Sequence, residues 1–184
     1  MVDGIILAGG YSSRLGKNKM NITFKDKPVL VHTIENMKSV CDRVIVVTGH
    51  YHKQIKPIIE DIEGIKIVYN ENYSQGMFSS VIAGVNQVNN DFFLIPGDYP
   101  LVSREVYNKL LLGNKSIRVP SFEHKLGHPI FFDFSYKKLL LNSKVNNLKA
   151  FRNQFAFEII TVNDSAILFD IDTIKDVNRL KNKE

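Results

Sequence analysis

Residues 7–19 carry a group of side chains that could bind an anion. They read L-A-G-G-Y-S-S-R-L-G-K-N-K, so Arg14 and Lys19 lie among glycines and serines. Glycines let backbone N–H groups approach phosphate oxygens, an arginine can donate two parallel hydrogen bonds, and a lysine adds a point charge. The spacing matches neither the G-x-x-x-x-G-K-[ST] phosphate loop nor the G-x-G-x-x-G dinucleotide loop. By composition alone, a solvated basic loop explains the segment as well as phosphate binding does.

Three aspartates could hold a divalent cation. Asp98 follows an apolar run, so its carboxylate should project beyond the end of a strand, and carboxylate oxygens suit Mg²⁺. Asp170 and Asp172 are two residues apart, which places both on one side of an extended segment. We expect Asp172, or else Asp170, to be the second ligand. Two other interpretations stay open: Asp98 forms a turn before Pro100, and Asp172 caps the last helix together with Thr173.

The elements that must position these side chains alternate between strand-like and helix-like patterns. Continuous apolar runs are typical of strands buried on both faces, and apolar residues on a helical period indicate the helices between them. The expected strands are residues 4–8, 43–48, 65–69, 91–96, 116–120, 129–132 and 158–162. The expected helices are residues 28–39, 52–62 (with a kink or a start at Pro57), 77–88, one that Ser103 caps, 135–142 and 173–181. This order predicts an α/β fold: an open, mostly parallel, twisted sheet with helices on both faces.

A sheet of this kind binds ligands beyond the carboxyl ends of its strands. Three polar, glycine-containing segments fall at these ends: residues 9–19, 97–102 and 126–129. Their convergence at one edge of the sheet is stronger evidence for a site there than any one of the motifs.

The same segments resemble the nucleotidyltransferases of the MobA-like group. Residues 7–19 are similar to the signature L-A-[AG]-G-x-S-x-R-[ML]-G-x-x-K, and residues 97–102 to a G-D-x-P-L-V metal segment. Residues 72–80 are similar to a segment of the cytidylyltransferase branch that contains Asn, Gly-Met and Ser. Residues 127–129 match its G-H-P, and residues 170–173 match its D-I-D-T. The resemblance spans essentially the whole chain and implies one domain over residues 1–184, a Rossmann-like nucleotidyltransferase with three α/β/α layers.

The resemblance implies an Mg²⁺-dependent enzyme that transfers a nucleoside monophosphate from a nucleoside triphosphate to a phosphate-bearing acceptor and releases pyrophosphate. It implies catalytic roles for three residues: Arg14 on the β- and γ-phosphates, Lys19 on the α-phosphate, and Asp98 on the metal. The nucleotide- and substrate-binding residues that it implies are Leu7, Ala8, Gly9, Gly10, Ser12, Ser13, Thr48, Gly49, Asn72, Gly76, Ser79, Ser80, Gly97 and His128.

For several of these residues a purely structural role fits as well. Thr48 and Gly49 could form an ordinary turn at the end of a strand. Ser79 and Ser80 could lie near the start of a helix without contacting a ligand. His128, between a glycine and a proline, could act as a general base or could orient its loop, and a phosphate nucleophile has little need of a base.

The nucleotide and the acceptor are the least defined part of this prediction. More segments agree with the branch that uses CTP and a molybdopterin-type cofactor, but the L-A-G-G form of the loop, with Gly10, is associated with guanylyl-transferring relatives. A sugar-phosphate or isoprenoid-precursor nucleotidyltransferase would share the loop and the metal aspartate. A non-catalytic nucleotide-binding accessory protein for a molybdoenzyme is a further alternative. A molybdoenzyme is also an expected partner, as the recipient of the product.

Composition narrows the class of protein. The chain has 184 residues with a formal net charge of +5, from 24 Lys and Arg against 19 Asp and Glu. The basic residues form no stripe interleaved with aromatic residues, so nucleic acid is not the expected partner. A single cysteine, Cys41, excludes an intrachain disulfide. We see neither an apolar run long enough for a membrane helix nor a basic start followed by a long apolar segment, so we expect a cytoplasmic protein without membrane contact.

Overall fold

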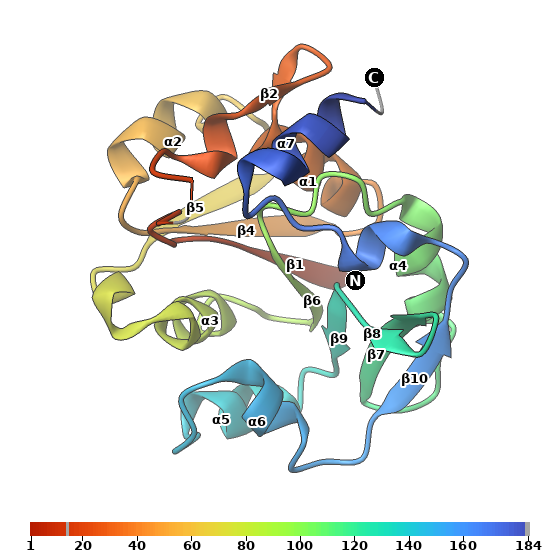
Figure 1. The fold of residues 1–184 in the computed structure, drawn as a ribbon. Coiled ribbons are helices and arrows are strands. Elements are labelled where there is room, and N and C mark those ends of the chain that lie inside the picture. The colour runs from red at the N-terminus through yellow and green to blue at the C-terminus, as the bar shows by residue number, and fades with distance from the viewer. Residues whose placement is uncertain (14, 183–184) are drawn as a thin grey trace.

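The structure, a computed structural model, describes residues 1–13 and 15–182 and consists of a twisted sheet with helices on both of its faces (Figure 1). The strands of the sheet are β1 (Val2–Ala8), β4 (Arg43–Thr48), β5 (Ile65–Tyr69), β6 (Asp91–Pro96), β7 (Ile117–Phe122), β8 (Lys125–Leu126), β9 (Ile130–Phe132) and β10 (Glu158–Thr161). The α-helices are α1 (Val29–Lys38), α2 (His52–Ile59), α3 (Met77–Val85), α4 (Arg104–Leu111), α5 (Tyr136–Leu141), α6 (Leu148–Arg152) and α7 (Ile174–Lys181). The remaining elements are a hairpin of β2 (Thr23–Phe24) and β3 (Lys27–Pro28), and the 3-10 turns η1 (Lys19–Asn21), η2 (Tyr73–Gln75) and η3 (Ser165–Leu168).

The strand order β10-β7-β9-β6-β1-β4-β5, with β8 paired to β7, confirms a mostly parallel sheet. β1 pairs in parallel with both β4 and β6, so the loops that follow these three strands emerge at one edge. β9 runs antiparallel to both β6 and β7. The chain returns from β7 to β9 over too few residues for a parallel crossover, which needs a dozen or more.

Alternate residues of β1 face two different apolar layers. Ile6 packs into the layer that α1, α2 and α4 cover, whereas Ile5 packs into the layer that α3, α5 and α6 cover. Figure 1 shows these two sets of helices on opposite sides of the sheet. Both isoleucines are fully buried, as expected for a central strand with helices on each face. The predicted layer arrangement is therefore confirmed.

Two local predictions are decided by the structure. Pro57 lies inside α2, which excludes the alternative that it marks the start of the helix. Ser103 stands at the N-cap of α4 but makes no capping hydrogen bond, because its hydroxyl donates to Asp164 Oδ2 at 2.9 Å. The sequence analysis did not anticipate the β2–β3 hairpin or α6, which are too short to give a periodic signal. In the part of the chain that the structure describes, no helix has the length and apolarity needed to cross a membrane.

Candidate active site

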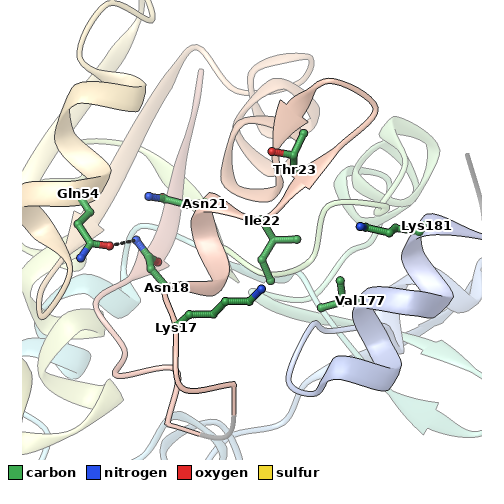
Figure 2. Close-up of a pocket in the computed structure, with 8 residues that line it drawn as sticks. All are labelled: Lys17, Asn18, Asn21, Ile22, Thr23, Gln54, Val177 and Lys181. Carbon is green, nitrogen blue, oxygen red and sulfur yellow. Dashed lines mark hydrogen bonds between the residues drawn. The ribbon is translucent and has the colours of Figure 1, made fainter.

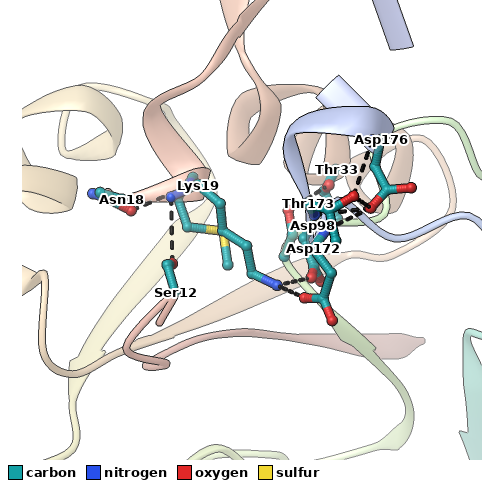
Figure 3. A network of polar contacts seen from close by, with 10 residues as sticks. Ser12, Asn18, Lys19, Thr33, Asp98, Asp172, Thr173 and Asp176 are labelled. Carbon is teal, nitrogen blue, oxygen red and sulfur yellow. Dashed lines mark hydrogen bonds and ion pairs between the residues drawn. The ribbon is translucent and has the colours of Figure 1, made fainter. Parts of the chain in front are cut away.

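Lys19 joins the glycine-containing loop to two aspartates from distant parts of the chain (Figure 3). Its Nζ donates to Asp98 Oδ2 and, at 2.7 Å, to Asp172 Oδ1. Asp98 follows β6, and Asp172 precedes α7. The backbone N–H of Lys19 donates to Ser12 Oγ at 3.3 Å, so this residue is held against the loop at one end and against the carboxylates at the other. Burial by itself would lower the pKa of Lys19, but the charges of the two aspartates outweigh this and raise it.

The predicted metal ligands lie together. Asp98, Asp170 and Asp172 each offer a carboxylate oxygen, and these atoms lie within 4.8 Å of one another. Asp98 is 4% exposed, and its Oδ1 is buried without a hydrogen-bond partner among the described residues. Burial and the nearby charge of Asp172 raise the pKa of Asp170. A group of hard oxygen donors that repel one another, one of them buried and unsatisfied, fits a divalent cation such as Mg²⁺.

The start of α7 fixes Asp172. Thr173 caps this helix: its hydroxyl accepts from the Asp176 N–H at 3.3 Å, while its own N–H donates to Asp176 Oδ2 at 2.8 Å. The Ile171 N–H donates to the Asp98 carbonyl at 3.2 Å, which brings this segment against the end of β6. Thr173 and Asp176 therefore perform the capping, and the Asp172 carboxylate faces Lys19 instead.

A cavity of about 240 Å³ opens in front of the ion pairs. The glycine loop forms one wall, and the ends of β1 and β6 form the floor. The lining residues are Leu7, Gly10, Ser12, Ser13, Lys19, Met20, Met77, Pro96, Asp98 and Asp172. The fold thus brings together most of the residues predicted to bind phosphate and metal. Arg14, predicted to bind the β- and γ-phosphates, lies outside the described residues.

A neighbouring cavity of about 230 Å³ shares Leu7, Gly10 and Met77 with the first. The predicted residues Gly9, Gly76 and Ser80 line it, together with Tyr11 and Tyr73. The two tyrosine rings meet edge to face, with their centroids 5.7 Å apart. Aromatic rings beside a glycine-lined cavity are suited to contact a planar base. The sequence analysis missed both tyrosines, although an aromatic residue within a glycine loop could have signalled Tyr11.

Residues 4–155 match the sequence model of the MobA-like NTP transferase domain. The chain belongs to this family. It is 30% identical over 181 residues to the molybdenum cofactor cytidylyltransferase of Escherichia coli (strain K12), covering 95% of this chain and 93% of the relative. It is 29% identical over 111 residues to a probable molybdenum cofactor guanylyltransferase of Bacillus mycoides (strain KBAB4), covering 59% of this chain and 54% of that relative.

Solved structures share the fold of this MobA-like chain. A nucleotidyl transferase from Methanothermobacter thermautotroptrophicus superposes with a TM-score of 0.87 at 17% identity, covering 100% of this chain and 97% of the other. A Mycobacterium tuberculosis H37Rv protein, described as a complex with manganese, superposes with a TM-score of 0.77 at 19% identity, covering 100% and 99%. These likenesses confirm the predicted nucleotidyltransferase fold.

The position that distinguishes the two forms of the MobA-like loop is Gly9. Counted along the signature, L-A-A-G and L-A-G-G differ at Gly9, whereas Gly10 is common to both. A Cβ on Gly9 would lie 2.7 Å from Ser80 Oγ, and a Cβ on Gly10 would meet nothing within 4 Å. The choice between CTP and GTP, linked above to Gly10, therefore concerns Gly9.

Three predicted binding residues, Thr48, Gly49 and Gly97, line neither of the two cavities beside the loop. The Thr48 side chain is buried, and its hydroxyl donates to the Val68 carbonyl at 3.2 Å. A Cβ on Gly49 would lie 2.6 Å from the Gly9 carbonyl oxygen, so the glycine permits two loops to pass closely. Gly97 is packed against the side chains of α1 and η1, and its carbonyl accepts from Thr33 at 2.9 Å. Of the three residues, Gly49 packs directly against the glycine loop, and it lines a separate cavity beside α2.

Asn70 organises the segment that follows β5, and the sequence analysis missed it. Its Nδ2 donates to Ser79 Oγ at 2.8 Å and to Ser80 Oγ at 3.0 Å, and its Oδ1 accepts from the Asn72 N–H. Asn72 and Ser79 line a separate cavity of about 380 Å³ beside α3 and α5, whereas Ser80 faces the cavity with the tyrosines. A polar residue directly after an expected strand was the available signal for Asn70.

His128 packs its ring against Tyr99, with the centroids 5.1 Å apart, and lines neither of the two cavities beside the loop. Its Nδ1 is buried and has no hydrogen-bond partner within the described part of the chain. Burial, together with the charge of Arg152, lowers the pKa of His128 to about 4. The imidazole is therefore neutral near pH 7, and its backbone N–H anchors the loop by donating to the Ile167 carbonyl at 3.0 Å.

A larger cavity, of about 450 Å³, lies on the other side of the loop (Figure 2). The residues that line it are Lys17, Asn18, Asn21, Ile22, Thr23, Gln54, Val177 and Lys181. Asn18 donates to Gln54 Oε1 at 3.3 Å and so ties the loop to α2. This cavity contains none of the residues predicted from the sequence to bind substrate. The candidate active site of this MobA-like transferase is therefore the smaller cavity that holds Lys19 and the aspartates.

Proposed function

We propose that this nucleotidyltransferase-family enzyme uses Mg²⁺ to transfer a nucleoside monophosphate, with CTP as the favoured donor, to a phosphate-bearing acceptor of the molybdopterin type. Pyrophosphate is the second product. The observation that carries the proposal is the meeting of Lys19 with Asp98 and Asp172 in a cavity walled by the glycine loop. The family model matches residues 4–155, and we extend the domain to residues 1–184 because β10 and Asp172 complete the sheet and the site.

The reaction needs positioning more than proton transfer. A phosphate monoester has a second pKa of about 6, so the acceptor oxygen is already anionic near neutral pH. That oxygen attacks the α-phosphorus, the bond to the β-phosphate breaks, and pyrophosphate carries away the displaced charge. His128, neutral and outside the cavity, has a positioning role in this scheme and does not act as a base.

The chain's own groups supply alignment and charge. Backbone N–H groups of residues 9–13 cradle the triphosphate, Lys19 stabilises the charge that develops on the α-phosphate, and Arg14 binds the β- and γ-phosphates. Asp98 and Asp172, with Asp170 beside them, would hold Mg²⁺, which when bound neutralises phosphate charge. The manganese described for a structural neighbour supports a divalent cation in this fold.

CTP is favoured over GTP because the cytidylyltransferase relative aligns with almost the whole chain, whereas the guanylyltransferase alignment covers 59% of it. Gly9 in the L-A-G-G form of the loop is the observation that favours GTP as the second candidate. The molybdopterin-type acceptor, and a molybdoenzyme that receives the product, are proposed from the same two relatives.

A thermal-shift panel of CTP, GTP, ATP and UTP with Mg²⁺ tests the donor. A ligand that binds the folded state raises the melting temperature, so we expect CTP with Mg²⁺ to give the largest shift. A larger shift with GTP would identify GTP, in place of CTP, as the donor. No shift with any nucleotide contradicts the proposal.

Asp98→Asn tests the catalytic assignment. With molybdopterin as acceptor, we expect pyrophosphate release to fall by about a hundredfold or more, the scale seen when a preorganised electrostatic contact is removed. The variant keeps the shape of the side chain, so its far-UV circular dichroism should match that of the unaltered protein. Near-normal release of pyrophosphate contradicts the role of Asp98.

A further inference from the structure

The ammonium group of Lys19 contacts the same carboxylates that are suited to bind a divalent cation. Nζ donates to one oxygen of Asp98 and to Oδ1 of Asp172 (Figure 3). These two aspartates belong, with Asp170, to the group whose oxygens lie within 4.8 Å of one another. Lys19 therefore neutralises part of a strongly negative site.

The position of the cavity limits the side from which a cation could approach the carboxylates. A cation that also contacts the phosphates of a nucleotide must face the cavity beside the glycine loop. Asp98 and Asp172 line this cavity together with Lys19, whereas Asp170 does not. The cavity side of the two aspartates is the side that Lys19 contacts.

Lys19 and a cation disfavour each other at that place. Mg²⁺ binds carboxylate oxygens at about 2.0–2.1 Å, and Lys19 Nζ already lies 2.7 Å from Asp172 Oδ1. Two positive groups at the same oxygens would also repel each other, more strongly in a partly buried site than in water.

The backbone of Lys19 is held in place while its side chain is long enough to turn. Its N–H is bound to Ser12 Oγ, and Asn18 Oδ1 accepts from the Met20 N–H at the start of η1. A lysine side chain has a flexible four-carbon stem. Because Ser12 and Ser13 line the same cavity, an ammonium group released from the aspartates stays beside the place proposed for the phosphates.

We infer that Lys19 and a divalent cation compete for the carboxylates of Asp98 and Asp172, an inference that rests on the proposed function. Without nucleotide, Lys19 holds the two aspartates and keeps the affinity for the cation low. When a triphosphate binds, its charge attracts Lys19 away from the aspartates and opens them to the cation. The loop lysine thereby couples the binding of the metal to the binding of the nucleotide.

The test is Mn²⁺ binding without nucleotide, measured from the electron paramagnetic resonance signal of free Mn²⁺. We expect Lys19→Met to raise the Mn²⁺ affinity by about tenfold or more, because it removes a positive charge at the carboxylates themselves. Lys17→Met is the matched control. It removes the same charge from a residue two positions earlier in the loop, whose side chain lines the other cavity. Equal affinities in the two variants overturn the inference, as does tight Mn²⁺ binding by the unaltered protein without nucleotide.

A second measurement needs no variant. Site-resolved mass spectrometry gives the rate at which an amine reagent labels Lys19, with Lys17 as the internal reference. Mn²⁺ at a concentration that saturates the site should speed the labelling of Lys19, because competition frees its ammonium group. An unchanged ratio of the two rates overturns the inference. If the unaltered protein fails to bind Mn²⁺ even with CTP, the proposed function fails as well, and this outcome is distinct from the others.

Discussion

Nζ of Lys19 lies 2.7 Å from Oδ1 of Asp172, although the two residues are 153 positions apart in the sequence. The pair joins the glycine loop after β1 to the segment that precedes α7. Because Asp98 accepts from the same ammonium group, three separate segments meet at the carboxyl edge of the sheet.

Asp172 should matter more than Asp170 for cation binding. Asp172 lines the cavity and contacts Lys19, whereas Asp170 is not among the residues that line the cavity. With CTP present, we expect Asp172→Asn to weaken Mn²⁺ binding by at least about tenfold, and Asp170→Asn to have a smaller effect as a supporting residue. Mn²⁺ titrations of the two variants check this order, and a larger loss in Asp170→Asn would reverse the assignment.

Gly9→Ala should destabilise the protein through Ser80. The new Cβ would lie 2.7 Å from Ser80 Oγ, which Asn70 also holds by a hydrogen bond. Overpacking of this kind costs about 1–3 kcal/mol of unfolding free energy. Ser80→Ala removes the clashing oxygen, so the double variant should recover most of the loss in urea unfolding.

Gly10→Ala is the control for this cycle, since a Cβ there meets nothing within 4 Å and should change stability little. If Gly9→Ala lowers the free energy of unfolding equally with and without Ser80→Ala, the contact with Ser80 is not the cause of the destabilisation. The same variants, tested with CTP and GTP, also show whether Gly9 influences the choice of base.

Stability should fall as the pH is lowered from about 6.5 towards 4 because of His128. Burial and the charge of Arg152 lower the pKa of its imidazole to about 4 in the folded protein, against about 6.5 in an unfolded chain. Between these values the unfolded state binds a proton that the folded state does not, so unfolding becomes more favourable as the pH falls. His128→Gln should therefore lose less unfolding free energy across this window than the unaltered protein, as measured by urea titrations. Parallel losses would contradict the assignment.

Thr173→Ala should loosen the start of α7. Thr173 and Asp176 satisfy each other's backbone N–H groups, and loss of such a cap costs about 0.5–2 kcal/mol of unfolding free energy. Because the cap follows Asp172 directly, we also expect weaker Mn²⁺ binding in the presence of CTP. Thr173→Ser keeps the hydroxyl and serves as the control. A variant without the hydroxyl that unfolds like the unaltered protein would rule out the cap as a source of stability.

The sequence was most informative where a pattern is local. The apolar runs of β4 and β6 gave their bounds correctly because a buried strand leaves a continuous signal of its own. The Ser103 cap failed because its hydroxyl has a competing partner, Asp164, that lies 61 residues away. Asn70 and the two tyrosines beside the loop were missed because their roles depend on neighbours that only folding supplies.

The sequence by itself determined the alternation of strands and helices, the loop of residues 7–19, and the resemblance that named its family, since each depends on the order of neighbouring residues. Only the tertiary structure decided that Asp172 faces Lys19 while Thr173 caps α7, and that Gly9 lies against Ser80. It also set His128 beside Tyr99, outside the cavity. These relationships depend on which strand ends lie side by side, and the packing of the sheet fixes that across the whole length of the chain.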